Sequence, residues 1–163
     1  MSPFVVRQAG SVDLEVIVPL FDAYRQFYGQ PSEPDRVGAF LHERLAQGDS
    51  VLLIAEADGQ AVGFTQLYPS FSSVSMAPIF ILNDLFVRPE ARRLGVARRL
   101  LEAALGKARE AGAIRLSLST ALTNTAAQAL YASAGWERDA VFCVYHLTVH
   151  QPPPPPSHRA QQA

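Results

Sequence analysis

The feature that most constrains the fold is a strand, a basic loop and a helix that follow one another between Pro78 and Gly112. Residues 78–87 form a long apolar run, broken only by the polar pair Asn83-Asp84, which predicts a buried strand. After Gly95, small and apolar residues recur with the 3.6-residue period of an amphipathic helix, at Ala97, Leu100, Leu101, Ala104, Leu105 and Ala108. A strand predicted at Ile114–Leu118 then completes a crossover, which makes its two strands parallel.

The remaining segments supply an antiparallel meander and three further helices. Helices are predicted at Val12–Tyr28, at Pro34–Ala46 and from Asn124 to Gly135; strands are predicted at Phe4–Arg7, Val51–Ala55, Ala61–Tyr68 and Val141–Val149. Asp58-Gly59 is a hairpin signal, and Pro69–Ser73 is read as a loop. The order β-α-α-β-β-β-α-β-α-β predicts an α/β (α+β) fold with a mixed, mostly antiparallel twisted sheet flanked by helices.

The length of 163 residues suits one domain, which we place at residues 1–150. Residues 151–163 contain five consecutive prolines, Pro152–Pro156, and are expected to form a Pro-rich disordered tail. A docking role for this proline run is the alternative to a solvated tail.

The composition excludes several classes of protein. The net charge of −1 and the lack of a basic–aromatic stripe disfavour a nucleic-acid partner. No apolar run approaches the roughly 20 residues of a membrane helix, and the N-terminus lacks a signal-peptide core. Cys143 is the single cysteine, which fits a reducing compartment, so we expect a cytoplasmic protein with no membrane partner. The histidines and Cys143 lack metal-ligand spacing, so no metal is expected.

The loop before the central helix is a candidate anion site. Gly95 and Ala97 are small, and the first amides of a helix have no intrahelical partner, so a phosphate group fits there. Four arginines add positive charge around it: Arg92, Arg93, Arg98 and Arg99. An ordinary helix start with a solvated basic face explains the same residues equally well. Neither G-x-G-x-x-G nor G-x-x-x-x-G-K-[ST] occurs, which disfavours a Rossmann dehydrogenase and a P-loop kinase.

Two motifs resemble those of the GNAT (N-acetyltransferase) superfamily. Arg92-x-x-Gly95-x-Ala97 is similar to its [RQ]-x-x-G-x-[GA] acetyl-CoA motif. A second block resembles the family's N-x-x-A-x-x-L-Y-x-x-x-G-F signature, with Trp136 in place of Phe: Asn124-x-x-Ala127-x-x-Leu130-Tyr131-x-x-x-Gly135-Trp136. The resemblance covers about residues 4–149. Two further segments, Tyr24-Arg25-x-Phe27-Tyr28 and Leu82-Asn83-Asp84-Leu85-Phe86-Val87, resemble a bacterial subgroup similar to histone- and polyamine-acetylating enzymes.

The resemblance implies a splayed pair of parallel central strands that holds acetyl-CoA as cosubstrate. The pyrophosphate is expected on the amides of Arg93–Ala97, and the pantetheine arm beside the end of the preceding strand, where the Val87 amide would polarise the thioester carbonyl. The expected cofactor-binding residues are Leu85, Phe86, Val87, Arg92, Arg93, Leu94, Gly95, Val96, Ala97, Asn124, Ala127 and Tyr131.

Asp84 is the candidate base or substrate anchor, because it is the one carboxylate on the long central strand. A purely structural carboxylate, or a water chain acting as the base, are the alternatives. Strand alternation places Asn83 and Asp84 on opposite faces unless a bulge intervenes. The acceptor amine is expected between Tyr28, the Ser70-Phe71 loop, Asn83 and Asp84. Diamine-acetylating members of the family carry a carboxylate in place of Asn83, which argues against a polyamine substrate.

Tyr131 is the candidate catalytic acid, because the family places a tyrosine there to protonate the departing thiolate. A core tyrosine with a satisfied hydroxyl is the alternative, and Asn124 is expected to be partly a helix cap.

The sequence therefore predicts an acetyl-CoA-dependent N-acetyltransferase for a primary amine, acting by direct attack in a ternary complex. A protein lysine or N-terminal amine acetyltransferase, and a non-catalytic CoA-binding module, are the alternatives. Related enzymes often dimerise, so we expect a homodimer, in which the terminal strand Val141–Val149 provides apolar surface.

Overall fold

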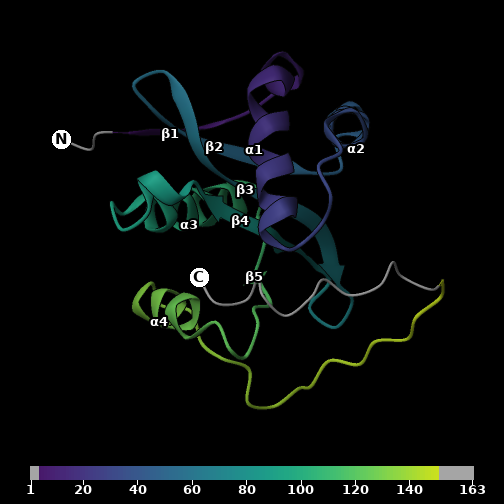
Figure 1. Ribbon diagram of the computed structural model, residues 1–163. Coiled ribbons are helices and arrows are strands. Elements are labelled where there is room, and N and C mark those ends of the chain that lie inside the picture. Colours follow the sequence, from purple (N-terminus) through teal and green to yellow (C-terminus); the bar gives the residue numbers. More distant parts are fainter. Residues whose placement is uncertain (1–3, 151–163) are drawn as a thin grey trace.

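A single five-stranded sheet organises the computed structural model, which describes residues 4–150 (Figure 1). Its strands lie in chain order: β1 (Val5–Gln8), β2 (Val51–Ala57), β3 (Gln60–Ser72), β4 (Ala77–Val87) and β5 (Leu116–Ser117). Neighbouring strands are antiparallel except for β4 and β5, which are parallel. The predicted mixed, mostly antiparallel sheet is therefore confirmed. The proline run and the rest of the predicted tail, 151–163, lie outside the described residues.

Helices cover both faces of this sheet. They are α1 (Leu14–Phe27), α2 (Pro34–Gln47), α3 (Val96–Glu110) and α4 (Thr125–Ser133), with short 3₁₀ turns at Ser11–Asp13 and Pro89–Ala91. Strand β2 separates two cores, because its alternate residues point to opposite faces. Leu52 and Ile54 pack toward α1 and α2, whereas Leu53 and Ala55 pack toward α3. Its continuous apolar run is thus that of a strand buried on both faces.

The parallel strands β4 and β5 separate after two residue pairs. Phe80 pairs with Leu116 and Ile81 with Ser117, and β4 then continues to Val87 without β5 beside it. On its other edge, β4 remains paired with β3 as far as Gly63↔Val87. Glycine is required at that point, since a Cβ on Gly63 would lie 2.9 Å from the Phe86 carbonyl oxygen. The absence of a side chain lets β3 pack closely against the end of β4 and the start of α3.

Two sequence expectations about local structure are wrong. The segment Pro69–Ser73, expected to be a loop, is mostly strand, because β3 continues to Ser72 opposite Ala77. Pairing with the long apolar β4 outweighs the turn preference of Pro69 and its neighbouring serines. The segment Val141–Val149, expected to be a final strand, forms no strand and is exposed. Alternation alone does not make a strand, because its backbone groups need a neighbouring strand to bond.

Candidate active site

The loop between β4 and α3 is bent by two residues with left-handed backbone conformations. Arg93 has φ of 63° and Gly95, at the start of α3, has φ of 85°. A Cβ on Gly95 would meet no protein atom within 4 Å, so it is the conformation rather than crowding that favours glycine there. Arg93, Leu94 and Gly95 are exposed in front of the first amides of α3, which have no intrahelical partners. This arrangement fits an anionic group such as a phosphate.

Arg92 fixes this loop to the end of β4. Its Nε donates a 3.0 Å hydrogen bond to the Val87 carbonyl, and its guanidinium lies 5.2 Å from the centre of the Phe27 ring. Arg98 donates to the Ser133 hydroxyl at 2.7 Å and so joins α3 to α4. The predicted arginines therefore differ in role: Arg92 and Arg98 hold the walls of the loop, whereas Arg93 is exposed at its surface.

The end of β4 presents backbone groups on the edge that β5 does not reach. The Arg88 amide donates to the Val62 carbonyl at 2.8 Å, on the β3 side. Because successive amides of a strand point in opposite directions, the Val87 amide points to the other edge. The Arg92 hydrogen bond to the Val87 carbonyl is made on that same edge. An extended ligand arm can therefore bond to β4 there as a further strand would.

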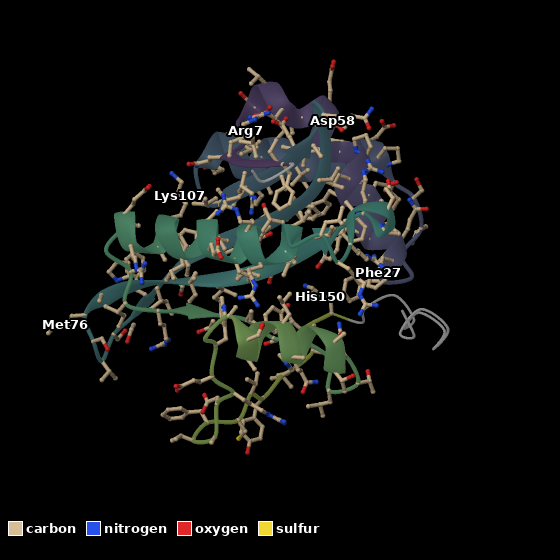
Figure 2. The ribbon with its side chains drawn as sticks, turned by 90° about the vertical axis from the view of Figure 1, so that its left-hand side faces the viewer. Arg7, Phe27, Asp58, Met76, Lys107 and His150 are labelled. Atoms are coloured by element: carbon tan, nitrogen blue, oxygen red, sulfur yellow. The ribbon has the colours of Figure 1, made fainter. Side chains whose placement is uncertain are left out.

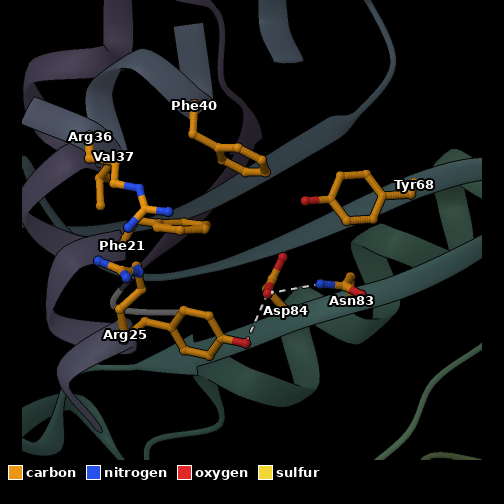
Figure 3. A pocket seen from close by; sticks show the side chains of 9 residues that line it. Phe21, Arg25, Arg36, Val37, Phe40, Tyr68, Asn83 and Asp84 are labelled. Atoms are coloured by element: carbon orange, nitrogen blue, oxygen red, sulfur yellow. Dashed lines mark hydrogen bonds between the residues drawn. The ribbon is translucent and has the colours of Figure 1, made fainter. Parts of the chain in front are cut away.

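On the opposite side of β4, Asp84 accepts hydrogen bonds from three side chains (Figure 3). The Tyr24 hydroxyl donates to Oδ1 at 2.8 Å, Gln66 Nε2 to Oδ2 at 3.1 Å, and Asn83 Nδ2 to Oδ1 at 3.2 Å. The carboxylate is only 5% exposed, yet every one of these donors is neutral. A buried carboxylate is normally paired with a cation, so this arrangement leaves a favourable place for a bound ammonium group.

A β-bulge brings Asn83 and Asp84 into one cluster. Gln66 pairs with Asp84, while its neighbour Leu67 pairs with Leu82, so Asn83 is left without an opposing residue. The additional residue changes the direction of the strand locally. Strict strand alternation predicts Asn83 and Asp84 on opposite faces unless a bulge intervenes. The structure contains that bulge, and the two side chains are hydrogen-bonded to each other.

Asp84 and Asn83 line a pocket of about 330 Å³ between α1, α2 and β4. The other lining residues are Phe21, Tyr24, Arg25, Arg36, Val37, Phe40 and Tyr68. Burial, and then the charge of Asp84, raise the pKa of Tyr24 well above its ordinary value and that of Tyr68 to about 12. Both phenols therefore remain protonated at neutral pH, and Tyr24 remains a donor to the carboxylate.

The acceptor-site residues expected from sequence are only partly brought together. Tyr28 lies just beyond α1, half exposed, with its ring centre 5.1 Å from that of Tyr24. Ser70 and Phe71 lie toward the far end of β3, opposite Ile79 and Pro78, and do not line the pocket.

The sequence reading missed three residues of this cluster: Tyr24, Gln66 and Tyr68. Gln66 carried a signal, because it is a polar residue within the otherwise apolar centre of a buried strand and is fully buried. Tyr24 lies on the apolar face of its helix, and nothing local in the sequence indicates that its hydroxyl reaches β4.

Helix α4 carries the second set of predicted residues. Asn124 Oδ1 accepts a 3.1 Å hydrogen bond from the Ala127 amide, so Asn124 caps the helix as expected. Tyr131 packs against the core with its ring centre 6.1 Å from that of Trp136. Within residues 4–150 its hydroxyl has no hydrogen-bond partner. Burial, with a contribution from Tyr28, raises the pKa of Tyr131, which keeps the phenol protonated and able to donate.

Residues 4–150 contain no group of three metal-ligating side chains close enough to hold an ion. No helix among them is both long and apolar enough to span a membrane.

The loop before α3 and the pocket at Asp84 are both built on β4. The chain belongs to the acetyltransferase (GNAT) family, whose model matches residues 17–136. It is thus an N-acetyltransferase of a family that uses acetyl-CoA.

Individual relatives agree with this assignment. The chain is 51% identical over 144 residues to the uncharacterized N-acetyltransferase YhfO of Bacillus subtilis (strain 168), which covers 88% of this chain and 97% of the relative. A crystal structure of a probable acetyltransferase is 43% identical, with a TM-score of 0.87 over 91% of this chain and 99% of that one. An aminoglycoside N-acetyltransferase in complex with CoA is 25% identical, with a TM-score of 0.74 over 88% and 94%.

Proposed function

We propose that the enzyme transfers an acetyl group from acetyl-CoA to a small primary amine by direct attack in a ternary complex. The observation that carries this proposal is the buried Asp84 carboxylate, which faces a pocket and is hydrogen-bonded only to neutral donors. The pocket lining contains no cysteine or serine that could hold the acetyl group between two half-reactions. This favours direct attack over a covalent acyl-enzyme.

The β4–α3 loop supports the cosubstrate assignment. The first amides of α3 and the exposed Arg93 would hold the phosphates, and the free edge of β4 at Leu85 and Val87 would hold the pantetheine arm. Cosubstrate bound there supplies an activated acetyl thioester. The Val87 amide, aimed away from β3, would stabilise negative charge on the carbonyl oxygen.

The pocket residues supply the acid–base chemistry. Asp84 orients an ammonium group and accepts its proton directly or through water, because an alkylamine with a pKa near about 10 arrives charged. The amine nitrogen then forms the C–N bond as the C–S bond breaks. Tyr131 donates its phenolic proton to the departing sulfur and is reprotonated from solvent. In the net reaction, the ammonium loses two protons, of which one ends on the thiol and one in solvent.

The charge of the pocket wall supports an acceptor that carries an acidic group as well as its amine. Glu33 pairs with Arg25 at 2.9 Å and with Arg36 at 3.4 Å, so one carboxylate is shared by two guanidiniums. Arg36 is 76% exposed and lines the same pocket as Asp84. The site therefore offers one carboxylate for an ammonium and one exposed guanidinium, that of Arg36, for an anion. Polycations such as the aminoglycosides named for several relatives would be repelled by that charge.

We also propose that the protein works in the cytoplasm as a homodimer. Exposed apolar side chains between Val141 and Val149 support self-association, because a monomeric protein rarely exposes so many together.

Release of free CoA thiol across a panel of small amines, amino acids and peptides tests the reaction. We expect turnover with small amines and its loss in Asp84→Asn, with acetyl-CoA affinity measured by calorimetry unchanged. Asp35→Asn, an exposed carboxylate change on α2, is the matched control. Turnover with peptides alone would favour the protein-acetyltransferase alternative. Binding of acetyl-CoA without any turnover would favour the non-catalytic one.

A further inference from the structure

The Asp84 carboxylate has one hydrogen-bonding position left, and it lies on a single oxygen. A carboxylate can accept about four hydrogen bonds, two on each oxygen. Oδ1 accepts two, from the Tyr24 hydroxyl at 2.8 Å and from Asn83 Nδ2 at 3.2 Å. Oδ2 accepts one, from Gln66 Nε2 at 3.1 Å. A bound ammonium group is therefore directed to Oδ2, on the side of Gln66.

The carboxylate also imposes the orientation of the Gln66 amide. An ionised carboxylate only accepts hydrogen bonds, so the NH₂ end of the amide must face Asp84. Its other end, Oε1, is buried and has no hydrogen-bond partner among residues 4–150. A buried polar atom without a partner is costly and uncommon in folded proteins. The NH₂ group is thus held in place at the expense of the carbonyl oxygen of the same amide.

The same NH₂ group fixes the hydroxyl of Tyr68. Gln66 Nε2 donates its second hydrogen to Tyr68 Oη at 2.9 Å, so the phenol oxygen is an acceptor in this bond. The proton of the phenol is therefore directed elsewhere, and no group of residues 4–150 accepts it. Figure 3 shows the Tyr68 hydroxyl reaching into the pocket that Asp84 lines. Tyr68 consequently presents a hydrogen-bond donor to a ligand in this pocket.

Asp84 Oδ2 and Tyr68 Oη are thus an acceptor and a donor held by one nitrogen atom. With distances of 3.1 Å and 2.9 Å from Gln66 Nε2, and roughly 120° between its two N–H bonds, the two oxygens lie about 5 Å apart. A ligand nitrogen on Oδ2 and a ligand oxygen on Oη then stand about 3 Å from each other at ordinary hydrogen-bond distances. Atoms on neighbouring carbons have this separation in a staggered conformation. One more carbon between them lengthens it unless the chain folds back.

We infer that the acceptor is an amine with an oxygen on the carbon next to the one that bears the nitrogen. 2-Amino alcohols, their ethers and α-amino carbonyl compounds belong to this class. Asp84 Oδ2 binds the ammonium group, the Tyr68 hydroxyl donates to the neighbouring oxygen, and Gln66 positions both. The inference rests on the proposed function, because it names the class of amine for the same site. Arg36 lies across the pocket from Tyr68 in Figure 3, so an anionic group at the far end is a separate feature of the acceptor.

Three amines of equal chain length test this subsite: heptylamine, 2-butoxyethylamine and 3-propoxypropylamine. The last two replace one CH₂ by an ether oxygen, which only accepts hydrogen bonds, and they differ in its position. The kcat/KM of the parent for 2-butoxyethylamine should exceed that for its 3-propoxy isomer about five- to tenfold, the size of one net hydrogen bond. A parent that does not distinguish the two isomers would overturn the inference without any variant.

Tyr68→Phe removes the donor and keeps the ring. It should lower the ratio of kcat/KM for 2-butoxyethylamine to that for heptylamine about five- to tenfold, and leave the ratio for 3-propoxypropylamine unaltered. Differences in amine basicity cancel, because both enzymes are given the same amines. Tyr145→Phe, which deletes the same oxygen from an exposed side chain, is the control and should keep the ratios of the parent. Equal changes for both ethers, or no change for either, would contradict a donor at Tyr68.

Binding of the three amines to CoA-saturated protein, measured by calorimetry, needs no acetyl transfer. The parent should bind 2-butoxyethylamine more tightly than the 3-propoxy isomer, and Tyr68→Phe should lose that difference. A protein that shows this difference but acetylates none of the amines would refute the proposed activity and support the subsite. Equal affinities for the two ethers would refute the subsite even where all three amines are acetylated.

Discussion

The Tyr24 hydroxyl donates a 2.8 Å hydrogen bond to Asp84 across 60 positions of sequence, joining α1 to the centre of β4. This bond holds the carboxylate in one orientation toward the pocket, and Gln66 supports its second oxygen. In the proposed mechanism Tyr24 acts through Asp84 and is a positioning residue. Variants of the two residues therefore test the role of the carboxylate apart from the role of a group that orients it.

Asp84→Asn should lower kcat for the acceptor by about 10²-fold or more, since the amide cannot accept the amine's proton. Tyr24→Phe should lower kcat/KM by about tenfold through loss of one oriented hydrogen bond. Saturation kinetics distinguish the two roles: Asp84→Asn should lower kcat, whereas Tyr24→Phe should mainly raise KM for the acceptor. Equal losses of kcat in both variants would indicate a purely structural network.

The fold was largely predictable because its signals are local. The apolar stripe of α3, the Asp58-Gly59 hairpin and the continuous apolar run of β2 each depend on residues close together in sequence. The Asp84 cluster was not predictable from local sequence, because the bulge at Asn83 arises from pairing with β3 and Tyr24 is distant in sequence. Val141–Val149 shows the same limit, because its alternation is local but a strand also needs a neighbouring strand, and no strand of residues 4–150 pairs with it.

Tyr131→Phe should reduce turnover by about 10²–10⁴-fold, because it removes the proton donor but keeps the ring beside Trp136. Acetyl-CoA affinity and Tm should change little, as the hydroxyl has no hydrogen-bond partner within residues 4–150. Tyr145→Phe is the matched control, since it deletes the same oxygen from an exposed side chain. Stopped-flow release of CoA thiol measures the effect, and turnover within about twofold of the parent would leave Tyr131 as a packing residue.

Replacing Gly95 by Asp or Asn tests the phosphate site with a pair of nearly equal shape. Both residues tolerate the positive φ of 85° better than most side chains do, so backbone strain is similar in the two variants. Gly95→Asp places a negative charge at the start of α3 and should weaken acetyl-CoA binding about tenfold or more relative to Gly95→Asn. Isothermal titration measures both affinities. Equal affinities would mean that the phosphates bind elsewhere.

Asp22 makes the stability of the folded protein depend on pH in the acid range. The Ser32 hydroxyl at 2.6 Å and the Glu33 amide at 2.8 Å lower the pKa of this buried carboxyl. Because the pKa is lower in the folded state, the ionised carboxyl stabilises the fold. This stabilisation is fully present when the pH is above the unfolded-state pKa of about 3.9, and it is lost as the pH falls through the folded-state pKa.

Asp22→Asn should therefore lower Tm at neutral pH, and the difference from the parent should shrink in strong acid. Scanning calorimetry from about pH 7 to about pH 3 measures this, with exposed Asp35→Asn as the control. A difference that stays constant over the whole range would show that the carboxylate charge contributes nothing.

Arg36→Glu should change which acceptor the enzyme prefers. Pentylamine, cadaverine and ω-aminohexanoate share an aliphatic amine arm and differ at the far end, which is neutral, cationic or anionic. With Asp84 holding the ammonium and Arg36 exposed on the same pocket, the parent should have its highest kcat/KM with ω-aminohexanoate and its lowest with cadaverine. The charge reversal should move the ratio of these two values about three- to tenfold toward cadaverine, the size expected for one exposed charge pair.

Lys107→Glu makes the same change in net charge on α3, at the far end of the molecule from Phe27 (Figure 2), so it controls for long-range attraction. It should leave the ratio unaltered. The parent must also be assayed at raised salt, where the preference should weaken because the Arg36 side chain is exposed to screening ions. A parent that prefers cadaverine, or an Arg36→Glu enzyme whose ratio matches that of Lys107→Glu, would remove Arg36 from acceptor recognition. Asp84 would then stand alone as the charged group that selects the amine.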